Sequence, residues 1–190
     1  MKLALNFILF QLGWFSCVLG AANGLFWLGP LVVLAVVMIH LVLALRPAAE
    51  LYLALGAVAL GLLTDSLLLA TGWLTYAGPG LFGVLAPYWI VSMWALFATT
   101  LNVSLRWLRN RPALTVLMGL IGGPLSYLGG EKLGAMVFVA PVPALVALGL
   151  AWAAAMPVLV WLARRFDGVN PHRNRQAELA ALPWQVSADA

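Results

Sequence analysis

The sequence predicts an all-α fold: a polytopic membrane helix bundle of six transmembrane helices, with both termini in the cytoplasm. Of its 190 residues, 64% are hydrophobic and only 8% are charged, and the mean hydropathy is +1.02. A soluble domain has about 25% charged residues and is about half apolar. So few charged side chains cannot cover a soluble surface of this size, and the composition therefore indicates that lipid is the main solvent of the protein.

Six apolar stretches are long enough to cross a bilayer. A transmembrane helix needs about 20 mostly apolar residues, because lipid offers no hydrogen-bond partners to backbone N–H and C=O groups. Charged residues and Gly, Pro or Asn mark where each stretch ends. The predicted spans cover residues 3–22, 25–45, 51–71, 83–105, 113–130 and 135–163.

Three of these spans have features that bear on their boundaries. The first is preceded only by Lys2 and lacks a clear cleavage site, so we interpret it as a retained helix and not as a secretory signal. The fifth contains Pro124 among many glycines and is expected to be bent or broken. The sixth is longer than a span requires and contains Pro141 and Pro157, so it is expected to start late or to be kinked.

The chain divides into two predicted parts of different polarity. Residues 1–165 form the six-helix transmembrane domain, and residues 166–190 form a polar cytoplasmic tail. Within the tail, residues 173–182 have the length of one short helix. We interpret the tail as solvated chain and not as a docking motif.

The distribution of basic residues predicts the orientation. All but one of the ten Lys and Arg residues fall at the same ends of the spans, and only Lys132 falls at the opposite ends. Because cytoplasmic loops of membrane proteins are rich in Lys and Arg, both termini are predicted to be cytoplasmic. The pI of about 9.7 then reflects topology, and nucleic acid is not an expected partner.

Asp65 is the acidic residue that lies deepest within an apolar run, in the outer half of the third span. Ionisable groups inside a membrane are costly and must be satisfied by a neighbour. One hypothesis is that Asp65 binds a proton, a cation or a substrate. The other is that it is structural and holds helices together, and the absence of a second carboxylate nearby in the sequence slightly favours this second hypothesis.

Polar and small side chains recur along one face of the fourth span. They follow steps of three and four residues, which is the helical repeat, and are Tyr88, Ser92, Ala95, Thr99, Asn102 and Arg106. We predict that Thr99, Asn102 and Arg106 form an interhelical polar stripe, because interhelical hydrogen bonds contribute about 0.6 kcal/mol each. The alternative is that this face lines a ligand cavity.

A candidate ligand pocket is predicted in the outer half of the bundle, where polar and aromatic side chains from several spans come together. Trp and Tyr also gather at membrane interfaces for other reasons, so interfacial anchoring is the alternative. The predicted pocket residues are Asp65, Tyr88, Ser92, Asn23, Trp27, Trp89, Ser126, Tyr127 and Glu131.

No recognisable catalytic or metal-binding motif occurs in the sequence. Nucleophile elbows, zinc-binding His-Glu-x-x-His helices and phosphate-binding loops are all absent. Cys17 is the single cysteine, and His40 and His172 are the two histidines, which are too few for a metal triad. We therefore predict no catalytic residue, no metal and no cofactor.

Six segments resemble a known family in their order and spacing. They are residues 11–15 (QLGWF), 64–67 (TDSL), 86–89 (APYW), 96–102 (LFATTLN) with 104–107 (SLRW), and 122–127 (GGPLSY). Together they resemble the uncharacterised bacterial inner-membrane family called domain of unknown function 2878, over nearly the whole chain up to about Arg165. The resemblance implies location in a bacterial inner membrane. It also implies a cell-envelope role, since relatives are often encoded near lipid-modifying enzymes such as cyclopropane fatty acid synthases.

These observations leave three functional hypotheses. The first is a non-enzymatic membrane protein that is an accessory or lipid-binding component of membrane lipid modification or envelope stress response. Its partners would be membrane lipids and another membrane or cytoplasmic protein, met through Arg106, Arg109 and Arg111. The second is a small-molecule transport subunit with an outward-facing pocket, similar in outline to the substrate-capture subunits of energy-coupling-factor importers. The third is an intramembrane enzyme.

Overall fold

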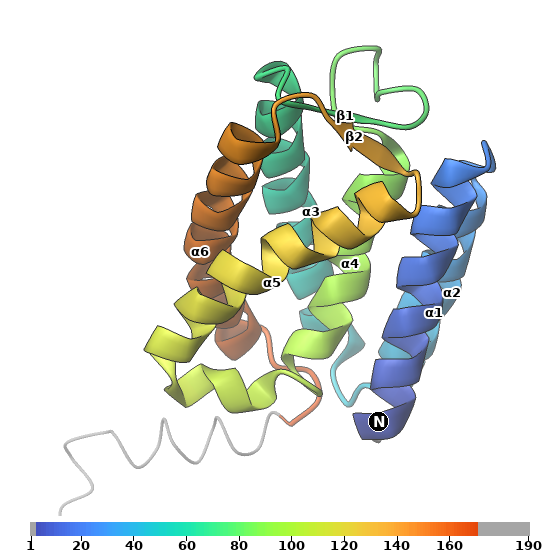
Figure 1. The fold of residues 1–190 in the computed structure, drawn as a ribbon. Helices are drawn as coiled ribbons and strands as arrows, with labels where there is room; N and C mark the ends of the chain where they lie inside the picture. The colour runs from blue at the N-terminus through green and yellow to red at the C-terminus, as the bar shows by residue number, and fades with distance from the viewer. Residues whose placement is uncertain (1–2, 171–190) are drawn as a thin grey trace, which may run out of the picture.

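Six α-helices run back and forth between the two ends of the molecule in a computed structural model that describes residues 3–170 (Figure 1). The helices are α1 (Leu3–Ala22), α2 (Leu28–Leu43), α3 (Pro47–Ala70), α4 (Tyr88–Leu101), α5 (Pro112–Lys132) and α6 (Pro141–Arg165), with the 3₁₀ helix η1 (Arg106–Asn110) between α4 and α5. The predicted helix within residues 173–182 lies outside the described residues.

The two ends of the bundle differ in charge. One end, which we call the basic end, contains the start of α1, the α2–α3 turn, η1 and the end of α6. Its arginines are Arg46, Arg106, Arg109, Arg111, Arg164 and Arg165. The other end, which we call the ribbon end, carries the short strands β1 (Leu74–Tyr76) and β2 (Met136–Phe138).

The fold is all-α apart from this two-stranded ribbon, and four helices are long and apolar enough to cross a membrane: α1, α3, α5 and α6. The bounds of α1 match the predicted span. Helices α2 and α4 are shorter than predicted, with 16 and 14 residues. At 1.5 Å per residue they are about 24 Å and about 21 Å long, less than the hydrocarbon thickness of about 30 Å.

The backbone conformation at the two ends of α4 explains why it is shorter than the predicted span 83–105. Pro87 has an extended backbone, with φ −59° and ψ 147°, so the helix starts only at Tyr88. At the other end, the carbonyl of Thr100 accepts the N–H groups of both Val103 and Leu105, which closes a turn in place of another helical turn. Arg106 therefore begins η1 and does not continue the face that carries Thr99.

Prolines begin three of the helices. A proline suits the first helical position, because its missing N–H would have no partner there and its φ is already helical. Helix α3 starts at Pro47, four residues before the predicted span, and this places Glu50 in the first turn of the helix, where its side chain is buried. Helix α6 starts at Pro141, which confirms that the last stretch starts late.

The sequence predicts that the fifth span is bent or broken. Helix α5 is continuous from Pro112 to Lys132 with Pro124 inside it, so the break is wrong, and the bend stays a prediction. Its glycines serve close packing against α6. A Cβ at Gly119 would lie 2.2 Å from the carbonyl oxygen of Trp152, and a Cβ at Gly123 would lie 2.4 Å from the Trp152 ring. A Cβ at Gly122 would meet no atom within 4 Å, because this residue faces an open space.

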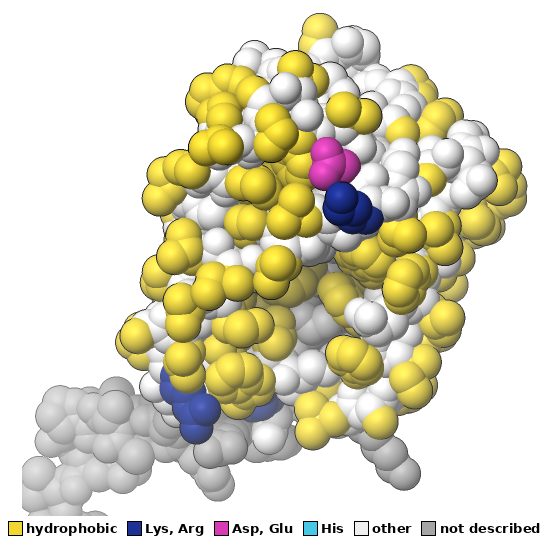
Figure 2. Space-filling view, in the orientation of Figure 1, with side chains coloured by type: hydrophobic (Ala, Val, Ile, Leu, Met, Phe, Trp, Pro, Cys, Tyr) yellow, Lys and Arg dark blue, Asp and Glu magenta, His cyan; other side chains and the backbone are white. Residues whose placement is uncertain are grey.

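Helix α4 forms the centre of the core. It packs against α1, α2 and α3, and large side chains such as Trp89, Trp94 and Leu96 are buried. The helices around it expose large apolar side chains, and hydrophobic groups cover most of the face shown in Figure 2. A soluble protein rarely exposes apolar patches of this extent, so the outer surface fits a lipid environment.

The ribbon connects the α3–α4 loop to the α5–α6 loop. Strands β1 and β2 are antiparallel, with Leu74 opposite Phe138 and Tyr76 opposite Met136. Side chains alternate between the two faces of a strand, and this alternation buries Leu74 and Tyr76 while exposing Thr75. The ribbon therefore places the Tyr76 hydroxyl over the end of α3.

Candidate functional site

Asp65 lies at the centre of a buried hydrogen-bond cluster near the ribbon end. Its side chain has no exposed surface. Tyr76 donates to Oδ1 at 2.8 Å, the Tyr127 hydroxyl donates to the same oxygen, and Trp94 Nε1 donates to Oδ2 at 2.7 Å. Three donors thus satisfy the two oxygens of the carboxyl group, and the cluster joins α3, β1, α4 and α5.

The cluster depends on a close approach of α3 and α4. Gly61 precedes Asp65 by one helical turn, and a Cβ there would lie 2.1 Å from the Trp94 ring. The absence of a side chain at Gly61 lets the indole lie against α3 and reach the carboxylate. The other face of Trp94 stacks on Trp152 of α6, with ring centroids 4.5 Å apart.

The predicted pocket residues do not all converge. The structure brings Asp65 and Tyr127 together, and Trp89 lies beside the cluster through a ring contact with Tyr76 at 6.0 Å. Tyr76 and Trp94 complete this cluster and were not predicted.

The remaining predicted residues lie elsewhere. Asn23 donates to the carbonyl of Leu19, Trp27 is 58% exposed on the outer surface, and Tyr88 is half-buried. The hydroxyl of Ser92 lies 3.8 Å from the sulfur of Cys17, and the hydroxyl of Ser126 accepts from Trp14 Nε1 at 3.1 Å. The carboxylate of Glu131 accepts the N–H of Phe138 at 3.2 Å.

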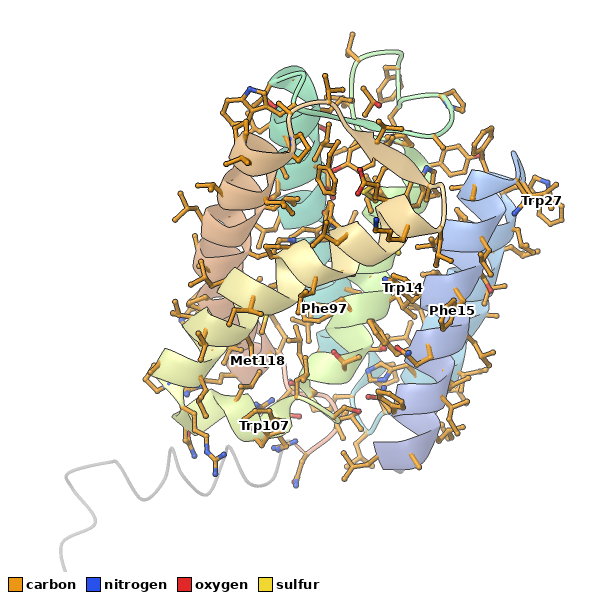
Figure 3. The ribbon with its side chains drawn as sticks, viewed as in Figure 1. Trp14, Phe15, Trp27, Phe97, Trp107 and Met118 are labelled. Atoms are coloured by element: carbon orange, nitrogen blue, oxygen red, sulfur yellow. The ribbon has the colours of Figure 1, made fainter. Side chains whose placement is uncertain are left out.

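A pocket lies closer to the basic end, between α1 and α5. Its volume is about 480 Å³, within the range of about 300–1,000 Å³ that is typical of small-molecule sites. Figure 2 shows the surface hollowed between these two helices, and Figure 3 shows Trp14, Phe97 and Met118 around this region. The lining residues are Phe7, Phe10, Gln11, Trp14, Phe97, Thr100, Ser104, Leu105, Met118, Gly122, Gly123, Leu125, Ser126, Trp152 and Met156.

The pocket wall carries no charged side chain and few polar groups. Thr100 donates to the carbonyl of Phe97, Ser104 donates to Asn6, and Ser126 accepts from Trp14. The amide of Gln11 makes no hydrogen bond to any residue in the described part of the chain. A polar group in a membrane span needs a partner, so Gln11 is available to a bound molecule.

A second buried polar cluster lies at the basic end, around Glu50. This carboxylate is 2% exposed. Its Oε2 lies 2.8 Å from His40 Nε2, and its Oε1 accepts from Asn102 Nδ2 and from the N–H of Gly168, both at 2.7 Å. The cluster joins α2, α3 and α4 to the segment after α6, so the first residues of the predicted tail pack against the bundle.

Asp167 adds an ion-pair network beside Glu50. Its Oδ2 accepts from Arg106 Nη2 at 2.7 Å and from Arg109 Nη1 at 2.9 Å. Burial raises the pKa of Asp167, but the N–H of Asn170 and the charges of Arg109 and Arg106 outweigh burial and lower this pKa below its usual value. Burial lowers the pKa of Arg109, although the charge of Asp167 opposes this shift. Both arginines are therefore engaged within the protein.

The three residues of the predicted stripe on α4 do not share one site: Thr99 bonds within the bundle, whereas Asn102 and Arg106 belong to the polar network of the basic end. Thr99 is buried and donates to the carbonyl of Leu96, while its own carbonyl accepts from Asn6 Nδ2 at 3.1 Å. Asn102 is buried between Glu50 and Arg109, and Arg106 pairs with Asp167. No group of three or more His, Cys, Asp and Glu within residues 3–170 could hold a metal ion.

Several residues of these sites were missed from the sequence, Tyr76 among them, and four others show why. Glu50 was placed outside a span, although Pro47 is a recognisable start signal for a helix that includes it. Gln11 is an amide inside a span, and the same rule that drew attention to Asp65 applies to it. The contacts of Trp94 and Asp167 link residues distant in the sequence, and no local pattern indicates them.

Replacing Asp65 with Ala should destabilise the bundle. The change leaves the donors of Tyr76, Tyr127 and Trp94 without an acceptor in a buried site, at a cost of about 1–3 kcal/mol for each unsatisfied group. We expect a clearly lower thermal midpoint in detergent for Asp65→Ala than for the control Glu131→Ala, whose carboxylate accepts one backbone N–H. Equal midpoints for the two variants would remove Asp65 from this structural role.

The Asp167 ion pairs should make stability depend on pH. Because its folded-state pKa is lowered, the carboxylate stabilises the fold fully above the unfolded pKa of about 3.9, and this contribution disappears as pH falls through the lowered value. The stability difference between wild type and Asp167→Asn should therefore shrink on acidification, measured as thermal midpoints over a pH series. Glu131→Gln is the control, because Glu131 contacts a backbone N–H and not an arginine. A difference that is constant across the series would contradict this linkage.

A known family matches most of this chain. The profile of the family described as "Protein of unknown function (DUF2878)" matches residues 3–158, which confirms the resemblance seen in the sequence motifs. Comparisons with curated proteins and with solved structures returned no match. The matched range includes all of α1 to α5 and most of α6. The chain therefore belongs to the DUF2878 family, as a multi-pass helical membrane protein of unknown function.

Proposed function

We propose that this protein is a non-enzymatic membrane protein that binds one acyl chain of a membrane lipid in the pocket between α1 and α5. The observation that carries the proposal is an apolar pocket of about 480 Å³ on the side of the bundle, where lipid would be. Its size and apolar wall suit a hydrocarbon chain. The free amide of Gln11 offers one hydrogen bond to the carbonyl of an ester.

The proposal includes an orientation. We place all six helices in a bacterial inner membrane, with the basic end on the cytoplasmic side according to the positive-inside rule. Helices α2 and α4 are short, but α4 is buried by its neighbours and α2 packs against α1 and α4. In this orientation the pocket opens towards the cytoplasmic leaflet.

The transport hypothesis has less support. It requires a solute to reach Asp65, whereas this carboxylate has no exposed surface and already accepts three hydrogen bonds. The enzyme hypothesis requires an acid and a base at a shared cavity, and Asp65 and Glu131 accept different donors. Lipid binding needs only the pocket.

The orientation predicts that both termini lie in the cytoplasm. Reporter fusions at the N-terminus and at the C-terminus, using one reporter active in the cytoplasm and one active outside it, should both report the cytoplasm. A fusion within the 77–85 loop at the ribbon end is the control and should report the opposite side. Termini on opposite sides would contradict a six-span arrangement.

The pocket can be filled without disturbing the helix packing. Gly122→Phe places a ring in the open space, because a Cβ at this position meets no atom within 4 Å. The ring should exclude a lipid chain. With a phospholipid that carries a photoreactive group on one acyl chain, we expect cross-linking to pocket residues to fall about tenfold, equivalent to about 1.4 kcal/mol of lost packing.

The matched control is Ile121→Phe. Ile121 precedes Gly122 on α5, is 50% exposed and does not line the pocket. The Ile121→Phe variant adds the same ring to the outer surface and should leave pocket cross-linking unchanged. Undiminished pocket cross-linking in Gly122→Phe, with normal folding, would rule out the proposed site.

A further inference from the structure

Arg111 is a cation at the basic end without an acidic partner in the described part of the chain. Among residues 3–170 this end has two acids, and both are engaged: Asp167 with Arg106 and Arg109, and Glu50 with His40 and neighbouring donors. Arg111 is exposed, and its guanidinium lies 5.5 Å from the centroid of the Trp107 ring. Its charge is therefore available to a ligand from outside the protein.

This cation lies at the basic end of the lipid-facing pocket. Arg111 directly precedes α5, and Met118 of the pocket wall follows seven residues later, which is two turns along the same side of a helix. Ser104 and Leu105, also in the wall, lead directly into η1, which carries Trp107. Figure 3 shows Trp107 below Met118 at this end.

The Trp107–Arg111 pair has the chemistry of a site for an anionic headgroup. Trp is enriched at the headgroup level of membranes, and Trp107 is 47% exposed. A planar guanidinium can donate two parallel hydrogen bonds to a phosphate. A basic residue near an anionic membrane surface contributes about 1 kcal/mol of attraction.

We infer that the lipid held in the pocket is an anionic glycerophospholipid, with one acyl chain between α1 and α5 and its headgroup phosphate on Arg111. The inference rests on the proposed lipid-binding function and adds the class of headgroup. A lipid with a zwitterionic headgroup fits the same pocket but brings a positive group that Arg111 repels. Selection therefore comes from charge, while the chain occupies the apolar wall.

Comparison of the cross-linking of two photoreactive lipids tests the inference. The full-length protein is placed in phosphatidylcholine vesicles that contain either photoreactive phosphatidylglycerol or photoreactive phosphatidylcholine, each with its label on one acyl chain. We expect wild type to cross-link the anionic lipid about fivefold more, as about 1 kcal/mol predicts. Arg111→Gln should lose this preference and keep its cross-linking to phosphatidylcholine.

Arg165→Gln is the matched control. Arg165 is also exposed at the basic end and lies 5.9 Å from the centroid of an aromatic ring, that of Phe166, but neither residue lines the pocket. This variant should keep the preference. Equal loss in both variants would assign selection to the whole basic end and overturn the role of Arg111.

The two proposals fail in different ways. A preference retained in Arg111→Gln, together with reduced labelling in Gly122→Phe, would overturn the headgroup assignment and leave lipid binding intact. Undiminished labelling in Gly122→Phe would overturn the pocket itself and the headgroup inference with it.

Raised salt should also reduce the preference of the wild type for the anionic lipid, because salt screens exposed charges. A preference insensitive to salt would contradict selection by charge.

Discussion

The hydrogen bonds of Asp65 are the constraint on which the arrangement of α5 depends. Helix α5 packs mainly on α6, through glycines that lie against Trp152. Near its ribbon end, the Tyr127 hydroxyl links it to Asp65 of α3, and Ser126 links it to Trp14 of α1. Because lipid offers no alternative partner to a buried carboxylate, these donors must stay in place. Helix α5 is thus fixed at its ribbon end, while its other half stands away from α4 and leaves the pocket open.

The charged residues of the basic end fall into two groups, those held by buried acids and the exposed Arg111. Two buried acids, Glu50 and Asp167, hold α2, α3, α4, η1 and the segment after α6 together. Each buried ion needs its partners, since an unpaired charge inside a protein is very costly. Arg106 and Arg109 are consequently structural, although the sequence alone suggested them as docking residues together with Arg111. What distinguishes Arg111 is its position one residue before α5, beyond the reach of this network.

The sequence predicted elements well where one local signal decides them. Continuous apolar length predicted α1 to the residue, and the composition predicted the all-α membrane class. Prediction was poorer where local chain geometry competes with hydrophobicity, as at Pro87, which shortens α4. The candidate site was only partly predictable: Asp65 follows from the cost of burying a charge, whereas Trp94 reaches it across 29 residues of sequence. Tertiary pairing of this kind leaves no periodic pattern in a single chain.

An apolar pocket that faces lipid obeys different energetics from one that faces water. In a bilayer a lipid chain is already in hydrocarbon, so moving it into the pocket gains no hydrophobic free energy and only the difference in packing. Apolar walls such as Phe7 and Phe97 therefore decide which shapes enter, but they cannot by themselves select one lipid. Discrimination must come from the polar groups around the chain. Thr100, Ser104 and Ser126 of the wall already have partners within the protein. In the proposed complex the discriminating groups are therefore the amide of Gln11 within the pocket and the guanidinium of Arg111 at its end, and a charge change at Arg111 separates selection from occupancy.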